Sequence, residues 1–178
     1  LQRRFLFVLP FGFLLSGFTL LVAYLGEINP QITPLMPVLL SPWLSIHVSL
    51  IMIAYALYAY IFLNGILALC LRHKPEQVER LMLFSKLMSY PATLFLGVGI
   101  FIGSVWANVS WGNYWSWDSK EVWALITFMI YGVAFHGTSL PWMRKPIHYH
   151  IYMVLAFLSV LMTYVGVNYF LTGMHSYA

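Results

Sequence analysis

Five apolar stretches of membrane-spanning length constrain the fold of this sequence more than any other feature. About 20 consecutive apolar residues allow a helix to cross a bilayer. The stretches occupy residues 5–25, 43–71, 87–108, 122–140 and 151–171. Since backbone polar groups in lipid must be hydrogen-bonded within the protein, each stretch is predicted to be a helix. The sequence therefore predicts an all-α fold, a polytopic transmembrane helical bundle with about five spans.

The composition excludes most soluble alternatives. Charged residues make up 8% of the 178 residues, whereas a soluble domain has about 25%. The net charge of +4 is interpreted as a membrane-topology feature, so no nucleic-acid partner is expected. The single cysteine, Cys70, excludes an intramolecular disulfide and a CxxC motif. We interpret residues 1–178 as one transmembrane domain and, since the first residue is Leu1, we expect it to belong to a longer polypeptide or a complex.

Basic residues fall in alternate loops, which predicts the orientation of the spans. They precede the first span, separate the second from the third, and separate the fourth from the fifth: Arg3, Arg4, Arg72, Lys74, Arg80, Lys86, Arg144 and Lys145. These segments are predicted to share the inner side of the membrane. The segment 26–42, the loop 109–119 and the tail from Thr172 then face outward, with Lys120 as the only basic residue on that side.

The outer loop 109–119 is unusually rich in aromatic residues. It contains the run Trp111-Gly112-Asn113-Tyr114-Trp115-Ser116-Trp117-Asp118. An interfacial belt of Trp and Tyr explains one or two such residues but not this density. We interpret the run as a flat, apolar platform for a planar hydrophobic ligand, with indole N–H groups available for its polar edges. Asp118, followed by Glu121, also fits a capping box at the start of the fourth helix.

Three of the six histidines are candidate ligands. His47 begins the second span and His175 follows the fifth, so both are predicted at the level of the tryptophan-rich loop. A flat iron macrocycle takes one imidazole above and one below, so this pair forms a candidate bis-histidine haem site. His136 is predicted roughly 24 Å deeper than Lys120, from a rise of about 1.5 Å per residue, and an ionisable residue within a span is a functional candidate. The other three histidines, beside inner basic loops, are interpreted as solvated or interfacial: His73, His148 and His150.

Helix packing is the alternative explanation for these residues. A lone histidine in a span is often a packing residue, and Gly132, one turn from His136, suits either a flat ligand or a close helix contact. The combination of three histidines at two depths with one tryptophan-rich loop favours haem. A b-type electron-transfer subunit and a non-haem transporter with an aromatic gate remain as alternative functions.

The tryptophan-rich run and its continuation resemble a known motif. Residues 111–118, followed by Ser119-Lys120-Glu121-Val122-Trp123-Ala124-Leu125-Ile126-Thr127, resemble the WWD motif of haem-handling cytochrome c biogenesis proteins. Within that group the chain resembles the membrane subunit of the system II cytochrome c synthase of many bacteria and chloroplasts. The tail 166–177 and the segment His47-Val48-Ser49 resemble the same family, so the resemblance covers most of residues 43–178.

This resemblance implies a function in cytochrome c biogenesis. Haem b, bound as the transported substrate, would cross from the inner side and be presented at the outer WWD face for thioether attachment to the CxxCH motif of apocytochrome c. The chain would act as part of a holocytochrome c synthase, an enzyme of the lyase type. A non-catalytic haem exporter or chaperone is the alternative. The expected location is the bacterial inner (plasma) membrane, multi-pass and in contact with lipid, with the active face toward the periplasm or cell exterior, or the thylakoid membrane of a plastid.

The resemblance also implies roles for single residues. His47 and His175 match the outer axial ligands of the haem iron, and His136 matches one ligand of a deeper haem site. The motif positions implied to bind haem are Trp111, Gly112, Trp115, Trp117 and Asp118. The first span holds no histidine, so the second deeper ligand is expected from a partner membrane subunit or a fused N-terminal segment. We further hypothesise that Lys120, or the backbone around Gly112 and Asn113, pairs with a haem propionate.

Overall fold

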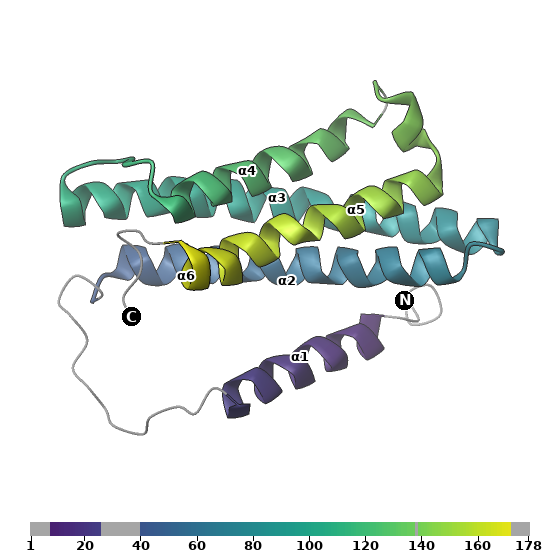
Figure 1. Cartoon of the computed structure of the whole chain (residues 1–178), viewed down its shortest axis with the longest axis horizontal. Helices are drawn as coiled ribbons and strands as arrows, with labels where there is room; N and C mark the ends of the chain where they lie inside the picture. Colours follow the sequence, from purple (N-terminus) through teal and green to yellow (C-terminus); the bar gives the residue numbers. More distant parts are fainter. Residues whose placement is uncertain (1–7, 26–39, 138, 172–178) are drawn as a thin grey trace.

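Each long apolar stretch folds as a helix in the computed structural model, which describes residues 8–25, 40–137 and 139–171. These residues contain no β-strand. Helix α1 (Val8–Leu25) is followed by two long helices, α2 (Pro42–Cys70) and α3 (Pro75–Trp111). Helix α4 (Ser119–Val133) continues into a 3-10 turn, η2 (Ala134–His136), and a second 3-10 turn, η3 (Pro141–Arg144), precedes α5 (Pro146–Leu161). A π-helical turn, η4 (Met162–Gly166), then joins α5 to α6 (Val167–Phe170) (Figure 1).

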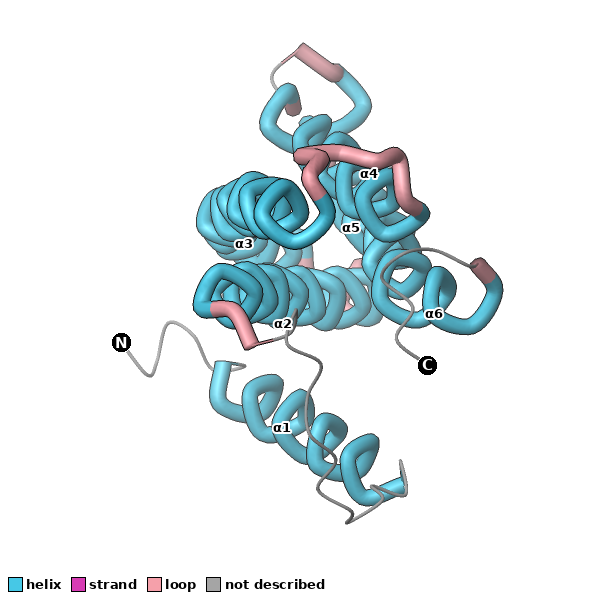
Figure 2. The backbone as a smooth tube through the Cα atoms, turned by 90° about the vertical axis from the view of Figure 1, so that its left-hand side faces the viewer, coloured by secondary structure: helices cyan, strands magenta, loops and turns pink. Residues whose placement is uncertain are grey.

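The helices pack around a long antiparallel pair. Helices α2 and α3 lie side by side, α5 packs against them, and α4 packs on α3 and α5 (Figures 1 and 2). Helix α1 stands apart from this group and contacts α2 through the rings of Phe11 and Tyr60, whose centroids are 5.7 Å apart. The amino-terminal end of α2, the loop between α3 and α4, and α6 all lie at one end of the bundle (Figure 1).

The predicted helical membrane bundle is confirmed. Three helical segments of the described chain are long and apolar enough to cross a membrane: Pro42–Cys70, Pro75–Trp111 and Pro146–Phe170. The two remaining predicted spans correspond to α1, which has 18 residues, and α4, which has 15. Both are shorter than the ~20 residues that a helix needs to cross a bilayer.

One pair of stacked rings and two hydroxyl–hydroxyl contacts join α2, α3, α4 and η4 in the core. The rings of Tyr58 on α2 and Tyr131 on α4 are stacked with centroids 3.6 Å apart. The Tyr58 hydroxyl lies 3.1 Å from the Thr93 hydroxyl on α3, and the hydroxyls of Thr127 and Thr163 lie 2.9 Å apart between α4 and η4. Because a buried polar group is costly unless it is hydrogen-bonded, these pairs fix the depth at which the helices meet.

The third helix begins earlier than the predicted span 87–108. Helix α3 starts at Pro75, so the charged segment predicted as an inner loop is mostly helical, and only residues 71–74 connect α2 to α3. Pro75 occupies the first turn, where its missing N–H costs nothing. Glu76 and Arg80 form an ion pair of 2.6 Å one turn apart. Hydropathy detects where a helix meets lipid and misses such a polar extension.

The other boundaries also differ from the predictions. Helix α4 ends at Val133 and its 3-10 extension at His136 rather than at 140, because the chain turns at Gly137 before Pro141. The fifth helix begins at Pro146 rather than at 151. Helix α3 continues to Trp111, so the predicted outer loop 109–119 is reduced to residues 112–118.

The earlier start of α5 corrects the interpretation of His150. This residue was expected to be solvated or interfacial, but its side chain is fully buried. Its Nε2 atom lies 3.2 Å from the carbonyl oxygen of Val78 on α3. His150 is therefore a packing residue that joins α5 to α3, whereas His148 in the same turn is exposed as expected.

Candidate functional site

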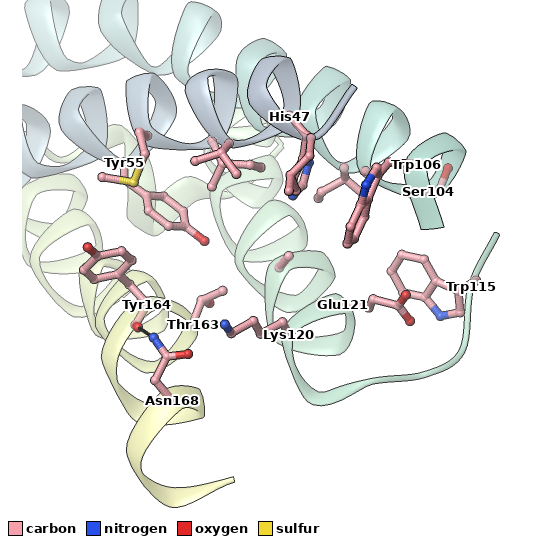
Figure 3. A pocket seen from close by; sticks show the side chains of 17 residues that line it. His47, Tyr55, Ser104, Trp106, Trp115, Lys120, Glu121, Thr163, Tyr164 and Asn168 are labelled. Carbon is pink, nitrogen blue, oxygen red and sulfur yellow. Dashed lines mark hydrogen bonds between the residues drawn. The ribbon is translucent and has the colours of Figure 1, made fainter. Parts of the chain in front are cut away.

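A pocket opens at the end of the bundle that carries the tryptophan-rich loop. Its volume is about 300 Å³, and it lies between α2, α3, α4, η4 and α6 (Figure 3). Side chains with polar or aromatic groups in its wall are His47, Tyr55, Ser104, Trp106, Trp115, Lys120, Glu121, Thr163, Tyr164 and Asn168. We call this cavity the outer pocket, because the loops at this end are those predicted to face outward.

His47 is held in a defined orientation by α3. Its Nδ1 atom lies 2.7 Å from the carbonyl oxygen of Gly99, and its ring points from α2 toward the pocket (Figure 3). A carbonyl only accepts, so this contact selects the tautomer with the proton on Nδ1 and leaves the lone pair on Nε2. In metal-binding histidines, a hydrogen bond from the ring nitrogen that does not bind the metal fixes the orientation of the ring. This orientation is compatible with the predicted role of His47 as an axial ligand.

Glycines on α3 make this arrangement possible. A Cβ atom on Gly103 would lie 2.6 Å from the His47 ring, so any larger residue there would displace the imidazole. The Gly99-x-x-x-Gly103 spacing is the pattern that lets membrane helices approach closely. These glycines were not predicted as site residues from the sequence, although their spacing indicates a close helix contact.

Two tryptophans contribute to the pocket wall. Trp115 comes from the loop, and Trp106, which is buried, comes from α3 and precedes the motif. Trp106 contacts Trp111 edge to face with ring centroids 4.8 Å apart, and Trp115 contacts Trp117 in the same way at 5.9 Å. The indoles therefore form two edge-to-face pairs, and one member of each pair, Trp106 and Trp115, lines the pocket. Trp117 itself is 73% exposed.

The remaining motif residues shape the loop. Gly112 ends α3 with φ of 79°, a left-handed conformation that favours glycine. The predicted capping box is confirmed: the Asp118 carboxylate accepts from the Lys120 backbone N–H at 3.1 Å, and the Glu121 carboxylate accepts from the Asp118 N–H, also at 3.1 Å. Glu121 also accepts from the Ser116 N–H at 2.9 Å. Asp118 and Glu121 hold the segment that carries Trp115.

The carboxyl-terminal helical segment also contributes to the pocket wall. Tyr164 on η4 and Asn168 on α6 both line it. His175 lies outside the described residues, so the predicted His47–His175 pair stays a prediction. Lys120 also lines the pocket and is half-buried, a position compatible with its hypothesised role toward a carboxylate.

His136 lies at the opposite end of the bundle from Lys120. It is the last residue of η2, beyond the carboxyl-terminal end of α4, and its side chain is exposed. The structure therefore separates His136 from His47, as the predicted two depths require. His136 does not line the outer pocket.

Comparison with known proteins gives one family. The profile of the family described as "Cytochrome C assembly protein" matches residues 2–175. Among curated relatives, protein NrfI of Wolinella succinogenes is 38% identical over 99% of this chain and 20% of its own length. The cytochrome c biogenesis proteins CcsA of Chlamydomonas reinhardtii and Cyanophora paradoxa are 39% and 34% identical, over 83% and 89% of this chain and 44% and 66% of their own lengths. The chain thus spans between a fifth and two thirds of the length of these relatives.

Proposed function

Because this chain belongs to the cytochrome c assembly protein family, we propose that it carries haem b across the membrane and presents it in the outer pocket for attachment to apocytochrome c. The relatives named for cytochrome c biogenesis support the reaction class. The family and its helical membrane bundle make the chain a multi-pass membrane protein. Basic residues are concentrated toward the end of the bundle opposite to the outer pocket. This distribution supports an active face on the periplasmic, extracellular or thylakoid-lumen side.

The observation that carries the proposal is the orientation of His47. The contact of its Nδ1 atom with the Gly99 carbonyl oxygen supports Nε2 as the proposed iron-binding nitrogen, in a pocket that Trp115 and Lys120 also line. The donor set fits an iron porphyrin, since the imidazole suits iron, the indoles suit the flat ring, and the ammonium group suits a propionate. The second axial position is assigned to His175.

In the proposed reaction, haem and the apocytochrome supply the reacting groups, and this chain supplies the binding site. Haem supplies an iron centre and two vinyl groups, and the apocytochrome supplies the CxxCH thiols; each S–H adds across a vinyl C=C, which forms a thioether without a net redox change. The outer pocket, of about 300 Å³, is also smaller than a porphyrin. The residues of this chain would therefore hold the iron and one edge of the ring, while the rest of the ring lies outside the cavity. Axial imidazole ligation also tunes the iron potential.

The deeper site is proposed to involve His136. A ligand exposed at the inner end of α4 suits reception of haem from the inner side. A second deeper histidine would come from a partner membrane subunit or from a fused N-terminal segment. Such a complex would form the holocytochrome c synthase.

Substitution of His47 by glycine tests the outer site. We expect His47→Gly to shift the Soret absorbance of the purified protein and to reduce the yield of covalent cytochrome c in a host without its own pathway. Added imidazole should partly restore both, because it fills the space of the lost side chain. His148→Gly, which removes an exposed histidine at the inner end, is the matched control. Unchanged spectrum and yield in His47→Gly would refute the assignment.

The same assay separates a synthase from a non-catalytic haem exporter or chaperone. A synthase complex yields cytochrome whose haem stays attached after acid–acetone extraction and shows the pyridine haemochrome of a thioether-bound haem. An exporter yields only extractable haem b.

A further inference from the structure

A second pocket lies at the end of the bundle opposite to His47. Its volume is about 330 Å³, and its wall combines α3 with η2, the turn that follows it, and η3. The side chains that give it chemical character are Lys86, Ser89, Tyr90, Phe135 and Arg144. We call it the inner pocket, because its basic residues belong to the segments predicted to face inward.

Two cations converge on the inner pocket from distant parts of the sequence. Lys86 is on α3, and its ammonium nitrogen lies 5.4 Å from the ring centroid of the buried Tyr149, a cation–π contact that positions it. Arg144 ends η3. No Asp or Glu is among the residues that line this pocket. Two positive charges in the wall of one cavity favour a ligand with two negative charges.

An apolar wall accompanies the two cations. The rings of Tyr90 and Phe135 are stacked with centroids 4.9 Å apart and an interplanar angle of 21°. Phe135 and Gly137 line the pocket, and they are the chain neighbours of His136. The inner pocket therefore lies immediately beside the histidine assigned to the deeper haem site. A porphyrin macrocycle is larger than this cavity, so only one edge of it would enter.

We propose that the inner pocket binds the carboxylate edge of an incoming porphyrin, with Lys86 and Arg144 each pairing with one propionate. This inference rests on the proposed function, since it assigns the recognition of haem at the inner side. Charge-assisted pairs of Arg and Lys with carboxylates are directional and strengthen where water is partly excluded. The stacked pair of Tyr90 and Phe135 would contact the apolar ring beyond the propionates.

The test compares haem with its dimethyl ester, which keeps the ring, the iron and the vinyl groups but has no carboxylate. Dissociation constants for both ferric compounds are measured by absorbance titration of the full-length protein in nanodiscs. The variants are Lys86→Gln, Arg144→Gln and the double variant, in a His47→Gly background that weakens the outer site. Lys145→Gln, which removes a charge next to Arg144 but outside the pocket, is the matched control. Lys86→Arg combined with Arg144→Lys preserves both charges.

We expect the His47→Gly protein with both cations intact to bind haem more tightly than the dimethyl ester. Each neutral substitution should reduce that preference by up to about fivefold, because Arg144 is exposed and Lys86 is only partly buried. The affinity for the ester should stay unchanged. The control and the charge-preserving variant should keep most of the preference. Thermal unfolding of each variant shows whether the bundle is intact.

Other outcomes would overturn the proposal. One such outcome is equal affinity for haem and ester in the His47→Gly protein, and another is an equal loss of both affinities in the double variant. Either would show that Lys86 and Arg144 do not bind the propionates, while the proposed function would stand. Loss of co-purified phosphatidylglycerol with an unchanged haem preference would assign the pocket to lipid phosphate. Absence of binding of either compound, in this background and in the protein with His47, would reject the proposed function together with this inference.

Discussion

A Cβ atom built on Gly103 would lie 2.6 Å from the imidazole ring of His47, although the two residues are on different helices. Real Cβ contacts of this length essentially never occur. The hydrogen bond from the His47 ring to the Gly99 carbonyl oxygen exists only because the ring can enter the space above Gly103. The orientation of the proposed iron ligand is thus controlled by residues of α3.

Substitution of Gly103 by alanine should displace the His47 ring. The overlap is expected to cost about 1–3 kcal/mol if the ring stays in place, so the ring moves and loses its bond to Gly99. We expect a shifted Soret band and lower haem occupancy, measured by absorbance and pyridine haemochrome analysis. Gly12→Ala on α1, where nothing lies within 4 Å of the new Cβ atom, is the control. A wild-type spectrum in Gly103→Ala would contradict this account.

Loss of the Asp118 side chain should loosen the loop that carries Trp115. Asp118→Ala removes the acceptor of the Lys120 N–H and should lower the free energy of unfolding by about 0.5–2 kcal/mol. Asp118→Asn keeps an oxygen in the same place and should retain most of it. Thermal unfolding in detergent and tryptophan fluorescence report the two effects. Equal behaviour of both variants would argue against capping as the role of Asp118.

Two buried tyrosine hydroxyls should respond differently to removal. The Tyr131 hydroxyl is buried without a hydrogen-bond partner among the described residues, so Tyr131→Phe is expected to be neutral or stabilising by up to about 1 kcal/mol. The Tyr58 hydroxyl pairs with Thr93 at 3.1 Å, so Tyr58→Phe should cost about 1 kcal/mol. Both variants keep the stacked rings, and unfolding curves measured side by side give the comparison. The reverse order would refute this assignment of partners.

Histidine accessibility should distinguish His136 from His150. Without haem, diethyl pyrocarbonate is expected to modify the exposed His136 and to spare the fully buried His150. Preincubation with haem should protect His136 if it is a ligand of the deeper site. Peptide mass spectrometry measures both sites in one sample, and His148, also exposed, shows whether protection is specific. Equal protection of His148 and His136 would remove the support for a ligand role.

The sequence determined the features that depend on neighbouring residues. Apolar runs predicted the helical membrane bundle, because the bilayer leaves a long apolar segment little choice but a helix. The spacing of Asp118 and Glu121 predicted the capping box, whose atoms come from one turn of chain. The placement of His47 near the tryptophan-rich loop followed from helix length and topology. The polar start of α3 was missed because hydropathy does not report helix propensity in charged residues.

The tertiary structure decided which side chains meet. It placed the His47 ring against Gly99, separated by 52 positions in sequence, buried His150 against α3, and brought Lys86 and Arg144 to one pocket. A hydropathy pattern assigns a residue to a depth but not to a rotational position toward a particular neighbour. That position is set by the close packing of whole helices. Many packing arrangements bury similar apolar area, and a single glycine or a buried hydrogen bond selects one of them.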